Sequence, residues 1–442
     1  MRKSSNYWGD LLQPKEAFDR TRELLEKHHE WMKTTINLIA SENIPSPAVR
    51  EALTSDFGNR YAEGLPGERV YAGCIYIDQV EFLAIDLAKQ LFKAEHVNVQ
   101  PVSGVLANLA TYTALSEPGD TMMCLPISCG GHISMGKKKL GGTAGAVHGL
   151  EIEYLPFDEE KMNIDVDAAA KKIGEIKPKI LLFGGSVFLF PHPVRELCDV
   201  AKENGARVVY DAAHVIGLIG GKQFQDPLRE GAEVVTCSTH KTLPGPQHGM
   251  ILCSEELGDA IDHAVFPGVV SNHHLHAVAG VAIALAEMLE FGEDYAAQIV
   301  KNARALGKEL YDRGFKVLCP DQNFTSSHTL LIDITEYGDG GTLEKRLEES
   351  NIVLNRNLLP WDIREGRHYK NPGGIRLGTS EVTRLGMREK EMAEVAEFIK
   401  RVVIDEEKPD RVASDVAEFR RDYQRVHYAF ESVTQAYQYI KI

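Results

Sequence analysis

Short apolar runs alternate with segments of helical spacing between residues 78 and 253. The apolar runs predict β-strands at residues 96–100, 121–125, 151–155, 180–183, 208–210, 234–237 and 250–253. The segments whose apolar residues recur every three or four positions predict helices at residues 78–91, 106–115, 166–176 and 194–203. Strands that alternate with helices favour a mainly parallel sheet that is covered on both faces.

The pattern changes after His273. Two long apolar helices are expected at residues 275–291 and 295–313, followed by shorter α+β units at 328–334, 343–349 and 352–354. Amphipathic helices are expected at residues 15–29, 388–403 and 410–428. We therefore expect an N-terminal arm (1–40), a large domain (41–290) and a small C-terminal domain with terminal helices (291–442).

Composition and charge exclude several classes of protein. The 442 residues carry a net charge of −15, from 49 basic and 64 acidic side chains, which argues against a nucleic-acid or anionic-membrane partner. Residues 1–6 lack the apolar core of a signal peptide, and the longest apolar window, 277–289, contains Glu287 and is short for a membrane span. Seven dispersed cysteines fit buried core residues in a reducing compartment. A cytoplasmic location is the default expectation.

One lysine, Lys241, follows the end of a predicted strand, a position that suits a catalytic residue. The predicted strand at residues 234–237 ends in small and hydroxyl residues, and Lys241 follows before a turn rich in proline and glycine. An amine becomes a nucleophile when burial or a nearby cation lowers its pKa. Lys241 is therefore a candidate Schiff-base lysine, although most lysines are solvated surface charges.

Polar residues in or after other predicted strands are candidates to act together with Lys241. Asp211, at the end of the strand at 208–210, suits the ring nitrogen of pyridoxal phosphate, which it would keep protonated. Ser103, Gly104 and the backbone N–H groups that follow open a predicted helix and would hold a phosphate. Arg376, in a glycine-bounded strand, would bind a substrate carboxylate by its fork of donors. His214 is either a cofactor or substrate contact or a core histidine.

Two loops resemble binding loops. Residues 60–73 place Tyr61, Glu63, Arg69 and Tyr71 among three glycines and a proline, which favours a site loop over a purely structural one. Residues 41–43, Ser-Glu-Asn, follow an apolar run and precede a proline. They fit either a plain loop or helix cap, or polar groups presented to a pocket.

Seven segments closely resemble serine hydroxymethyltransferases, in that family's order across about residues 35–390. They read NLIASEN, YAEGLPGERVYAG, NVQPVSGVLAN, DAAHVIGL, STHKTLPGP, VFPG and GIRLGT. The resemblance implies an α/β, fold-type I pyridoxal-phosphate transferase fold like that of aspartate aminotransferase. Such a fold has a large, mostly parallel mixed sheet and a smaller C-terminal α+β domain. It also implies a homodimer whose active sites are built from both subunits, and details of the sequence are similar to the archaeal branch.

The resemblance assigns the cofactor contacts. Lys241 matches the Schiff-base lysine that holds pyridoxal 5'-phosphate covalently, and Asp211 matches the partner of the ring nitrogen. The remaining expected cofactor contacts are Tyr61, Ser103, Gly104, Val105, Cys129, Ser186, His214, Ser238, His240 and Gly268. Cys129 aligns with the histidine that stacks on the cofactor ring in the family, although His132 is nearby. Gly268 begins the loop that the neighbouring subunit is expected to contribute, and Tyr61 is also expected to cross the dimer.

The resemblance also assigns the substrate side. Ser41 and Arg376 match the contacts to the substrate carboxylate, Glu63 matches a proton shuttle, and Tyr71 and His214 complete the expected catalytic set with Lys241. Asn357 matches a contact to the pterin carrier. The expected activity is the interconversion of L-serine and glycine, with hydroxymethyl transfer to tetrahydrofolate or tetrahydromethanopterin.

Departures from the family pattern keep alternatives open. Val70 replaces the first of two adjacent tyrosines, and Gln247 followed by His248 stands where an arginine is expected. A pterin-independent aldolase of β-hydroxy amino acids or an α-methylserine hydroxymethyltransferase is the first alternative. A catalytically silent binding protein is the second, against which the retention of Lys241, Asp211 and Arg376 argues.

Two features stay outside this scheme. His273, His274 and His276 lie close in sequence, but they point to different faces of a helix without an accompanying carboxylate cluster, so no metal site is expected. The C-terminal segment is rich in aromatic residues, which suggests that it packs on the rest of the chain or at a subunit interface. These residues are Tyr423, Tyr428, Phe430, Tyr437 and Tyr439.

Overall fold

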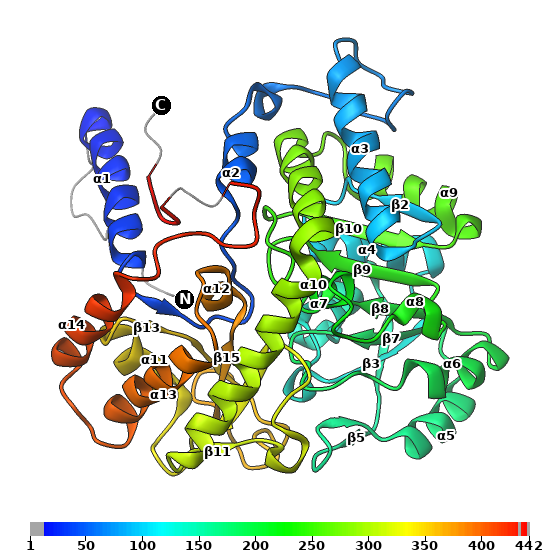
Figure 1. Cartoon of the computed structure of the whole chain (residues 1–442). Coiled ribbons are helices and arrows are strands. Elements are labelled where there is room, and N and C mark those ends of the chain that lie inside the picture. The colour runs from blue at the N-terminus through cyan, green and yellow to red at the C-terminus, as the bar shows by residue number, and fades with distance from the viewer. Residues whose placement is uncertain (1–12, 432–434, 440–442) are drawn as a thin grey trace.

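The computed structural model describes residues 13–431 and 435–439. Its larger sheet has seven strands in the order β2-β10-β9-β8-β7-β3-β4. Their bounds are β2 His96–Asn98, β3 Thr121–Cys124, β4 Glu151–Tyr154, β7 Ile180–Gly184, β8 Arg207–Asp211, β9 Val234–Ser238 and β10 Gly249–Cys253. Only β10 runs antiparallel to its neighbours, which confirms the predicted mixed, mostly parallel sheet (Figure 1).

Helices cover both faces of this sheet because its strands are apolar on both sides. Leu181 and Phe183 of β7 join one buried cluster, whereas Ile180 and Leu182 join the other. The helices around the sheet are α3 Ile75–Phe92, α4 Gly104–Leu115, α5 Val166–Ile176, α6 Val194–Glu203, α7 Ile216–Gly220, α8 Pro227–Glu230 and α9 Glu255–His263. A two-stranded sheet, β5 Phe157–Asp158 with β6 Asn163–Ile164, lies between β4 and α5 in the chain.

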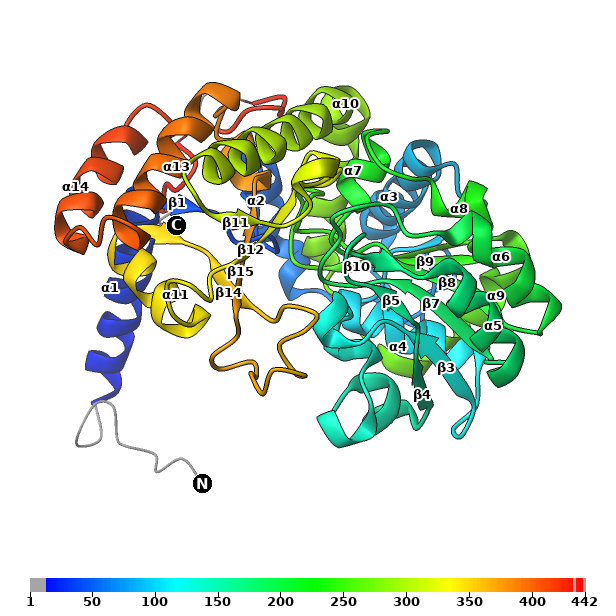
Figure 2. The same cartoon turned by 90° about the horizontal axis from the view of Figure 1, so that it is seen from below.

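A second, antiparallel sheet in the order β11-β12-β15-β14 forms the centre of the smaller unit (Figure 2). Its strands are β11 Lys316–Val317, β12 Thr329–Asp333, β14 Asn355–Asn357 and β15 Gly374–Gly378. The helices of this unit are α11 Gly340–Glu349, α12 Ser380–Arg384, α13 Glu389–Val403 and α14 Pro409–Arg420. Ile36 and Leu38 belong to its apolar core, so the N-terminal segment packs on the C-terminal part of the chain.

The N-terminal part of the chain contributes three elements to the structure. They are α1 Pro14–Met32, β1 Ile36–Asn37 and α2 Pro47–Leu53, and β1 pairs in parallel with β13 Ile352–Val353. This pairing places the loop at residues 38–46 between the smaller unit and the larger sheet. The segment with the family motif NLIASEN therefore lies where the two parts of the chain meet.

One long helix, α10 Leu275–Asp312, replaces the two helices that the sequence suggested (Figure 1). Gly292 does not break it, because a glycine inside a helix costs only about 1 kcal/mol relative to alanine. Gly221 lies so close to this helix that a Cβ atom at position 221 would collide with the Gly292 carbonyl oxygen and the Ala296 Cβ atom. By length and composition α10 passes as a membrane span, but 61% of its apolar window is buried inside the fold, as in a core helix.

The last helix is shorter than expected. Residues 410–428 were predicted to be helical, but α14 ends at Arg420. The guanidinium of Arg420 is buried and its Nε donates to the Thr35 carbonyl at 2.5 Å. This contact fixes the end of α14 against the N-terminal segment, and the chain then continues as an irregular segment.

Candidate active site

The polar residues that follow β7, β8 and β9 meet at one edge of the larger sheet. Gly184 lies beside Asp211 in the β7–β8 pair, and Asp211 lies beside Thr236 in the β8–β9 pair. A cavity of about 910 Å³ opens there, and its lining includes Ser41, His132, Ser186, His214, His240, Lys241, Gln247 and Arg376. A smaller cavity of about 190 Å³ shares His132, His240 and Lys241 with it and adds Ser103, Gly104, Val105, Asn108, Asp211 and Ser238. The structure thus gathers most of the predicted site residues.

Lys241 borders both cavities. Burial lowers the pKa of its amine from 10.5 to about 8, the negative charge of Asp211 opposes this shift, and the positive charge of Arg376 reinforces it. The backbone of Lys241 is fixed because its carbonyl accepts a hydrogen bond of 2.6 Å from Asn43 Nδ2. An amine with this pKa is a nucleophile at near-neutral pH, as a Schiff-base lysine requires.

Asp211 is buried and held by two donors. Its Oδ1 accepts from the Ala213 N–H at 3.0 Å, and its Oδ2 accepts from Asn108 Nδ2 at 2.8 Å. Thr236 Oγ1 donates to the carbonyl oxygen of Asn108 at 2.5 Å, so the amide group of Asn108 is oriented with its N–H donors toward Asp211. Asn108 lies one turn after Gly104 in α4, and that spacing within the motif NVQPVSGVLAN could have identified it.

The start of α4 forms a cradle for an anion. Ser103 caps the helix by accepting from the Leu106 N–H at 3.3 Å, and the first N–H groups of a helix have no partner within it. Gly104 approaches Ser238 so closely that a Cβ atom at position 104 would collide with Ser238 Oγ. His240 Nδ1 is buried without a hydrogen-bond partner among the described residues.

These groups fit pyridoxal 5'-phosphate. The cradle at the start of α4 suits the phosphate, the carboxylate of Asp211 suits a protonated ring nitrogen, and Lys241 supplies the amine. The three groups converge on the smaller cavity. A buried donor such as His240 without a protein partner is expected where a ligand provides the acceptor.

His132, and not Cys129, is the side chain that faces the two cavities. Cys129 lines neither cavity and packs beside the apolar core, with its Sγ 3.8 Å from Ser128 Oγ. The turn at residues 129–131 rotates the chain, so the residue three positions later reaches the cavity. Burial lowers the pKa of His132, and its Nδ1 accepts from the Ser134 N–H at 3.1 Å. The expected ring contact of Cys129 therefore stays a prediction, and His132 is the nearby side chain that lines both cavities.

Arg376 is a buried cation without an acidic partner. Its Nη1 donates to the Ser186 carbonyl at 2.8 Å and its Nε donates to Asn355 Oδ1 at 3.2 Å, and it forms no ion pair within the described ranges. Burial lowers its pKa to about 10. Ser41 lines the same cavity. A buried guanidinium that no protein carboxylate neutralises fits a substrate carboxylate.

His214 packs against a second histidine that sequence reasoning missed. The rings of His214 and His328 are stacked, with centroids 5.6 Å apart, and His328 Nε2 lies 3.1 Å from the Ala40 carbonyl. Burial lowers the pKa of both histidines, that of His328 to about 3, so both rings are neutral at physiological pH. Nothing in the sequence around His328 distinguishes it from a core histidine.

The loop at residues 60–73 does not reach the cavity of its own chain. Tyr61, Glu63 and Tyr71 line neither cavity, and Tyr61 and Tyr71 are exposed with ring centroids 4.7 Å apart. Glu63 instead interacts with Tyr61, whose hydroxyl donates to it at 3.2 Å, and with Ser271. Gly268 is also exposed and lines neither cavity.

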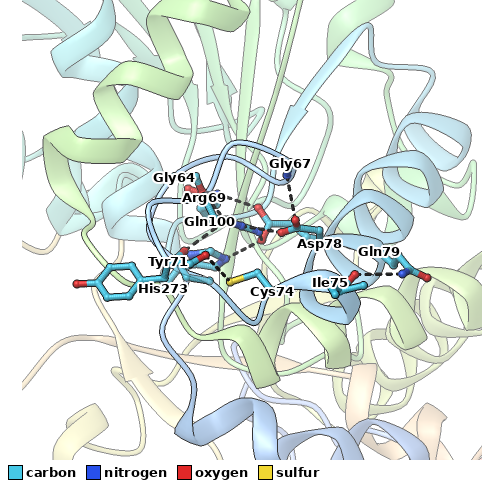
Figure 3. Close-up of polar contacts among 12 residues, drawn as sticks. Gly64, Gly67, Arg69, Tyr71, Cys74, Ile75, Asp78, Gln79, Gln100 and His273 are labelled. Atoms are coloured by element: carbon cyan, nitrogen blue, oxygen red, sulfur yellow. Dashed lines mark hydrogen bonds and ion pairs between the residues drawn. The ribbon is translucent and has the colours of Figure 1, made fainter.

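A buried ion-pair network fixes this loop to the body (Figure 3). Arg69 Nε contacts Asp78 at 2.8 Å, and Arg69 Nη2 contacts Glu81 at 2.6 Å. Glu81 also accepts from Gln100 Nε2 at 2.8 Å and lies 2.8 Å from His273 Nε2. Burial opposes ionisation of Glu81, but these hydrogen bonds and the nearby charges outweigh it and lower its pKa. The loop is therefore held in a fixed shape at the surface.

Residues expected on the carrier side divide into two groups. Gln247 lines the large cavity, whereas His248 is buried and its Nε2 lies 2.8 Å from the Val99 carbonyl. Asn357 lines neither cavity and bonds the adjacent Leu358 carbonyl, while Asn355, two residues earlier on β14, contacts Arg376. The side chains of a strand alternate between its faces, so positions 355 and 357 share a face and only the first is level with the guanidinium.

The three neighbouring histidines have separate environments. His273 pairs with Glu81, and the rings of His274 and His276 lie 5.7 Å apart near the start of α10. Among the described residues, no three or more histidine, cysteine or acidic side chains are grouped in a way that could hold a metal ion.

Comparisons with known proteins agree with this geometry. A family model described as serine hydroxymethyltransferase matches residues 15–399. A serine hydroxymethyltransferase of Nitrosopumilus maritimus is 56% identical over 435 residues, which cover 97% of this chain and 99% of the relative. One from Methanocaldococcus jannaschii is 59% identical over 414 residues, covering 93% and 95%, and one from Methanothermobacter thermautotrophicus is 57% identical over 424 residues, covering 96% and 98%.

Proposed function

The chain belongs to the serine hydroxymethyltransferase family, and from that premise we propose how its residues convert L-serine and glycine into one another with a reduced pterin as carrier. The family membership makes it a pyridoxal-phosphate-dependent hydroxymethyltransferase. The observation that carries the assignment of roles is the placement of Arg376, a buried cation without an acidic partner, in the same cavity as Lys241. That pair provides a carboxylate subsite beside a reactive amine.

When bound, pyridoxal 5'-phosphate supplies an electron sink for negative charge that develops at the substrate Cα. Lys241 would hold the cofactor covalently, and its lowered pKa leaves part of the amine uncharged near neutral pH, as that bond requires. Asp211 would keep a proton on the ring nitrogen, and the start of α4 with Ser238 and His240 would hold the phosphate. His132 borders both cavities on which these groups converge.

Arg376 and Ser41 orient the substrate. The fork of Arg376 binds the α-carboxylate through two donors, which fixes how the bonds of Cα are directed relative to the ring. His214, neutral and stacked on His328, borders the same space and does not add a competing charge. Among the described residues, Asp211 is the one carboxylate that lines the smaller cavity, and Glu42 and Glu348 line the larger one. Glu42 already accepts a hydrogen bond from Asn37 Nδ2, and the resemblance assigns the proton of the serine hydroxyl to Glu63 on another segment.

We propose that this segment is the loop at residues 60–73 of a second copy of the chain in a homodimer. Its Glu63 would move the proton, and Tyr61 and Tyr71 would close the site. The support is that these three residues lie outside the cavity of their own chain, on a loop that a buried network holds in shape. The adjoining surface is apolar and exposed, and it consists of Val70, Ile75, Tyr76, Phe82 and Leu83. Exposed apolar patches of this kind mark interfaces.

The carrier is proposed to be a reduced pterin, either tetrahydrofolate or tetrahydromethanopterin. Gln247 lines the large cavity, and Val70 is 70% exposed within the loop at residues 60–73, which supports a carrier bound between these two positions across the proposed dimer. Both residues differ from the family pattern at these positions, and this difference favours the second candidate, a pterin-independent aldolase of β-hydroxy amino acids. That enzyme would use the same cofactor and carboxylate subsites.

The two candidates differ in their need for a carrier. The purified holoenzyme is incubated with L-serine alone, with tetrahydrofolate and with tetrahydromethanopterin, and glycine is quantified. Glycine that forms rapidly with one carrier identifies that carrier, whereas equal rates with and without carriers favour the aldolase. Loss of the visible absorption band of the lysine-bound cofactor in Lys241→Ala is the control for the site.

A further inference from the structure

The C-terminal segment returns to the N-terminal part of the chain. Arg50 Nη1 donates to the Ala436 carbonyl at 3.1 Å, and His29 Nδ1 lies 2.9 Å from the Tyr437 carbonyl. The backbone carbonyl of Gln424 accepts a hydrogen bond from the Ala436 N–H at 2.7 Å, which holds residues 435–439 against the segment that follows α14. Residues 435–439 thus pack between α1 and α2, next to the loop at residues 38–46.

Tyr437 is the one residue of this segment that reaches inward with a polar group. Its side chain is 8% exposed, and its hydroxyl donates to Glu381 Oε1. Glu381 lies in α12, is 4% exposed, and receives a second hydrogen bond at Oε2 from Asn37 Nδ2 at 2.8 Å. Burial raises the pKa of Glu381 to about 7, and the hydrogen bond from Tyr437 counteracts that rise.

Asn37 links Glu381 to the loop at residues 38–46, which contains Ser41. The same Nδ2 that reaches Glu381 also donates to Glu42 Oε2 at 2.8 Å, and Asn37 Oδ1 accepts from the Ile39 N–H at 3.1 Å. These bonds hold the chain on both sides of Ser41. Since Ser41 lines the cavity with Arg376, its position depends on the orientation of the Asn37 amide.

The far side of the loop is tied to the catalytic lysine. Asn43 Nδ2 donates to the Lys241 carbonyl at 2.6 Å and to Tyr295 Oη at 2.9 Å. The Tyr295 hydroxyl in turn donates to the Ser380 carbonyl at 2.9 Å, next to Glu381 in the chain. Hydrogen bonds therefore connect Tyr437 through Glu381 and Asn37 with Ile39 and Glu42, and the peptide bond between Ser380 and Glu381 joins this set to the bonds that hold Asn43.

We propose that the C-terminal segment at residues 435–439 fixes the substrate-carboxylate loop, and that Tyr437 is a positioning residue for Ser41. The proposal rests on the proposed function, because Ser41 matters only if the cavity binds an amino acid. Tyr437 does not touch the substrate. Its hydroxyl orients Glu381, which orients Asn37 and thereby the backbone around Ser41.

The test compares Tyr437→Phe with Tyr439→Phe in the holoenzyme. Tyr439 lies on the same segment with its ring 5.2 Å from that of His29, and no hydrogen bond of its hydroxyl is present among the described residues. Loss of one hydrogen bond to a buried carboxylate is expected to raise KM for L-serine by about fivefold to tenfold. kcat is expected to change by less than about twofold, since the groups that hold the cofactor are untouched. Tyr439→Phe should behave like wild type.

A second readout does not depend on turnover. Hydrogen exchange of the backbone amides at residues 36–44 is measured on the same holoenzymes, and Tyr437→Phe should exchange faster there than wild type while Tyr439→Phe does not. Unchanged KM and unchanged exchange in Tyr437→Phe would overturn the proposal, as would a fall of kcat with constant KM. If wild type does not turn over serine but the exchange still rises, the proposed function fails while the structural link stands.

Discussion

Replacing Lys241 by methionine should stabilise the cofactor-free protein at neutral pH. The pKa of Lys241 falls from 10.5 to about 8 in the folded chain, mainly because of burial. A difference of about 2.5 in pKa corresponds to about 3 kcal/mol, which the folded state loses whenever the amine must carry its charge. Because the side chain borders two cavities and is not enclosed on all sides by protein atoms, we expect about 2 kcal/mol for Lys241→Met at pH 7. Methionine keeps the length and apolar character of the uncharged side chain.

The sign of the pH dependence follows from the direction of the shift. The cost is fully present below pH 8, fades as the folded amine loses its proton between about pH 8 and 10.5, and is absent above 10.5. The free energy of unfolding is measured by urea denaturation of the cofactor-free wild type, Lys241→Met and the exposed control Lys345→Met. The advantage of Lys241→Met should be largest at pH 7 and vanish near pH 10.5. A variant less stable than wild type at pH 7, or a difference that does not change with pH, would refute the reasoning.

Three further substitutions test the other parts of the site. Arg376→Lys keeps the charge but loses the fork of donors, so steady-state kinetics should show KM for L-serine raised by about 10- to 100-fold; an unchanged KM would remove Arg376 from the carboxylate subsite. Gly104→Ala places a Cβ against Ser238 Oγ and should weaken cofactor binding by about tenfold or more in a spectroscopic titration, and wild-type affinity would argue against the phosphate cradle. Arg69→Met leaves the buried carboxylate of Glu81 without its cation and should cost about 3–5 kcal/mol of stability, measured by urea denaturation of the holoenzyme; a loss below about 1 kcal/mol would mean that water compensates the charge.

Much of the site was predictable because it lies at strand ends. Lys241, Asp211 and the Ser103–Gly104 turn each follow a short apolar run, and the parallel arrangement of β8 and β9 brings two of those ends to one edge. Arg376, proposed from its place in a glycine-bounded strand and matched by the family resemblance, lines the same cavity as Lys241. These predictions needed only local pattern and sheet topology.

Other features depend on contacts between distant segments. Whether Cys129 or His132 lines the cavities is decided by the course of a glycine turn, which no apolar period reveals. Helix α10 continues through Gly292, and the close approach of Gly221, about 70 residues earlier, to the backbone of Gly292 is invisible in the local sequence.

The C-terminal segment shows the same limit most clearly. Its aromatic residues indicated burial, and Tyr437 is buried, but the target of its hydroxyl is Glu381 in a different element. Phe430 is 62% exposed, so aromatic character alone did not distinguish the residue that packs inward from its neighbours. The partner of a polar group at the end of a chain is set by the tertiary fold, not by its own surroundings in sequence.

The formation of glycine from L-serine by the holoenzyme, followed with and without a reduced pterin, shows whether the cavity around Lys241 supports hydroxymethyl transfer. We expect glycine to appear in proportion to the methylene-loaded carrier, with tetrahydrofolate or tetrahydromethanopterin, and to fall to background in Lys241→Met. Glycine formed at the same rate without any carrier, or by Lys241→Met as fast as by wild type, would contradict the assignment of hydroxymethyl transfer to the cavity around Lys241, Asp211 and Arg376.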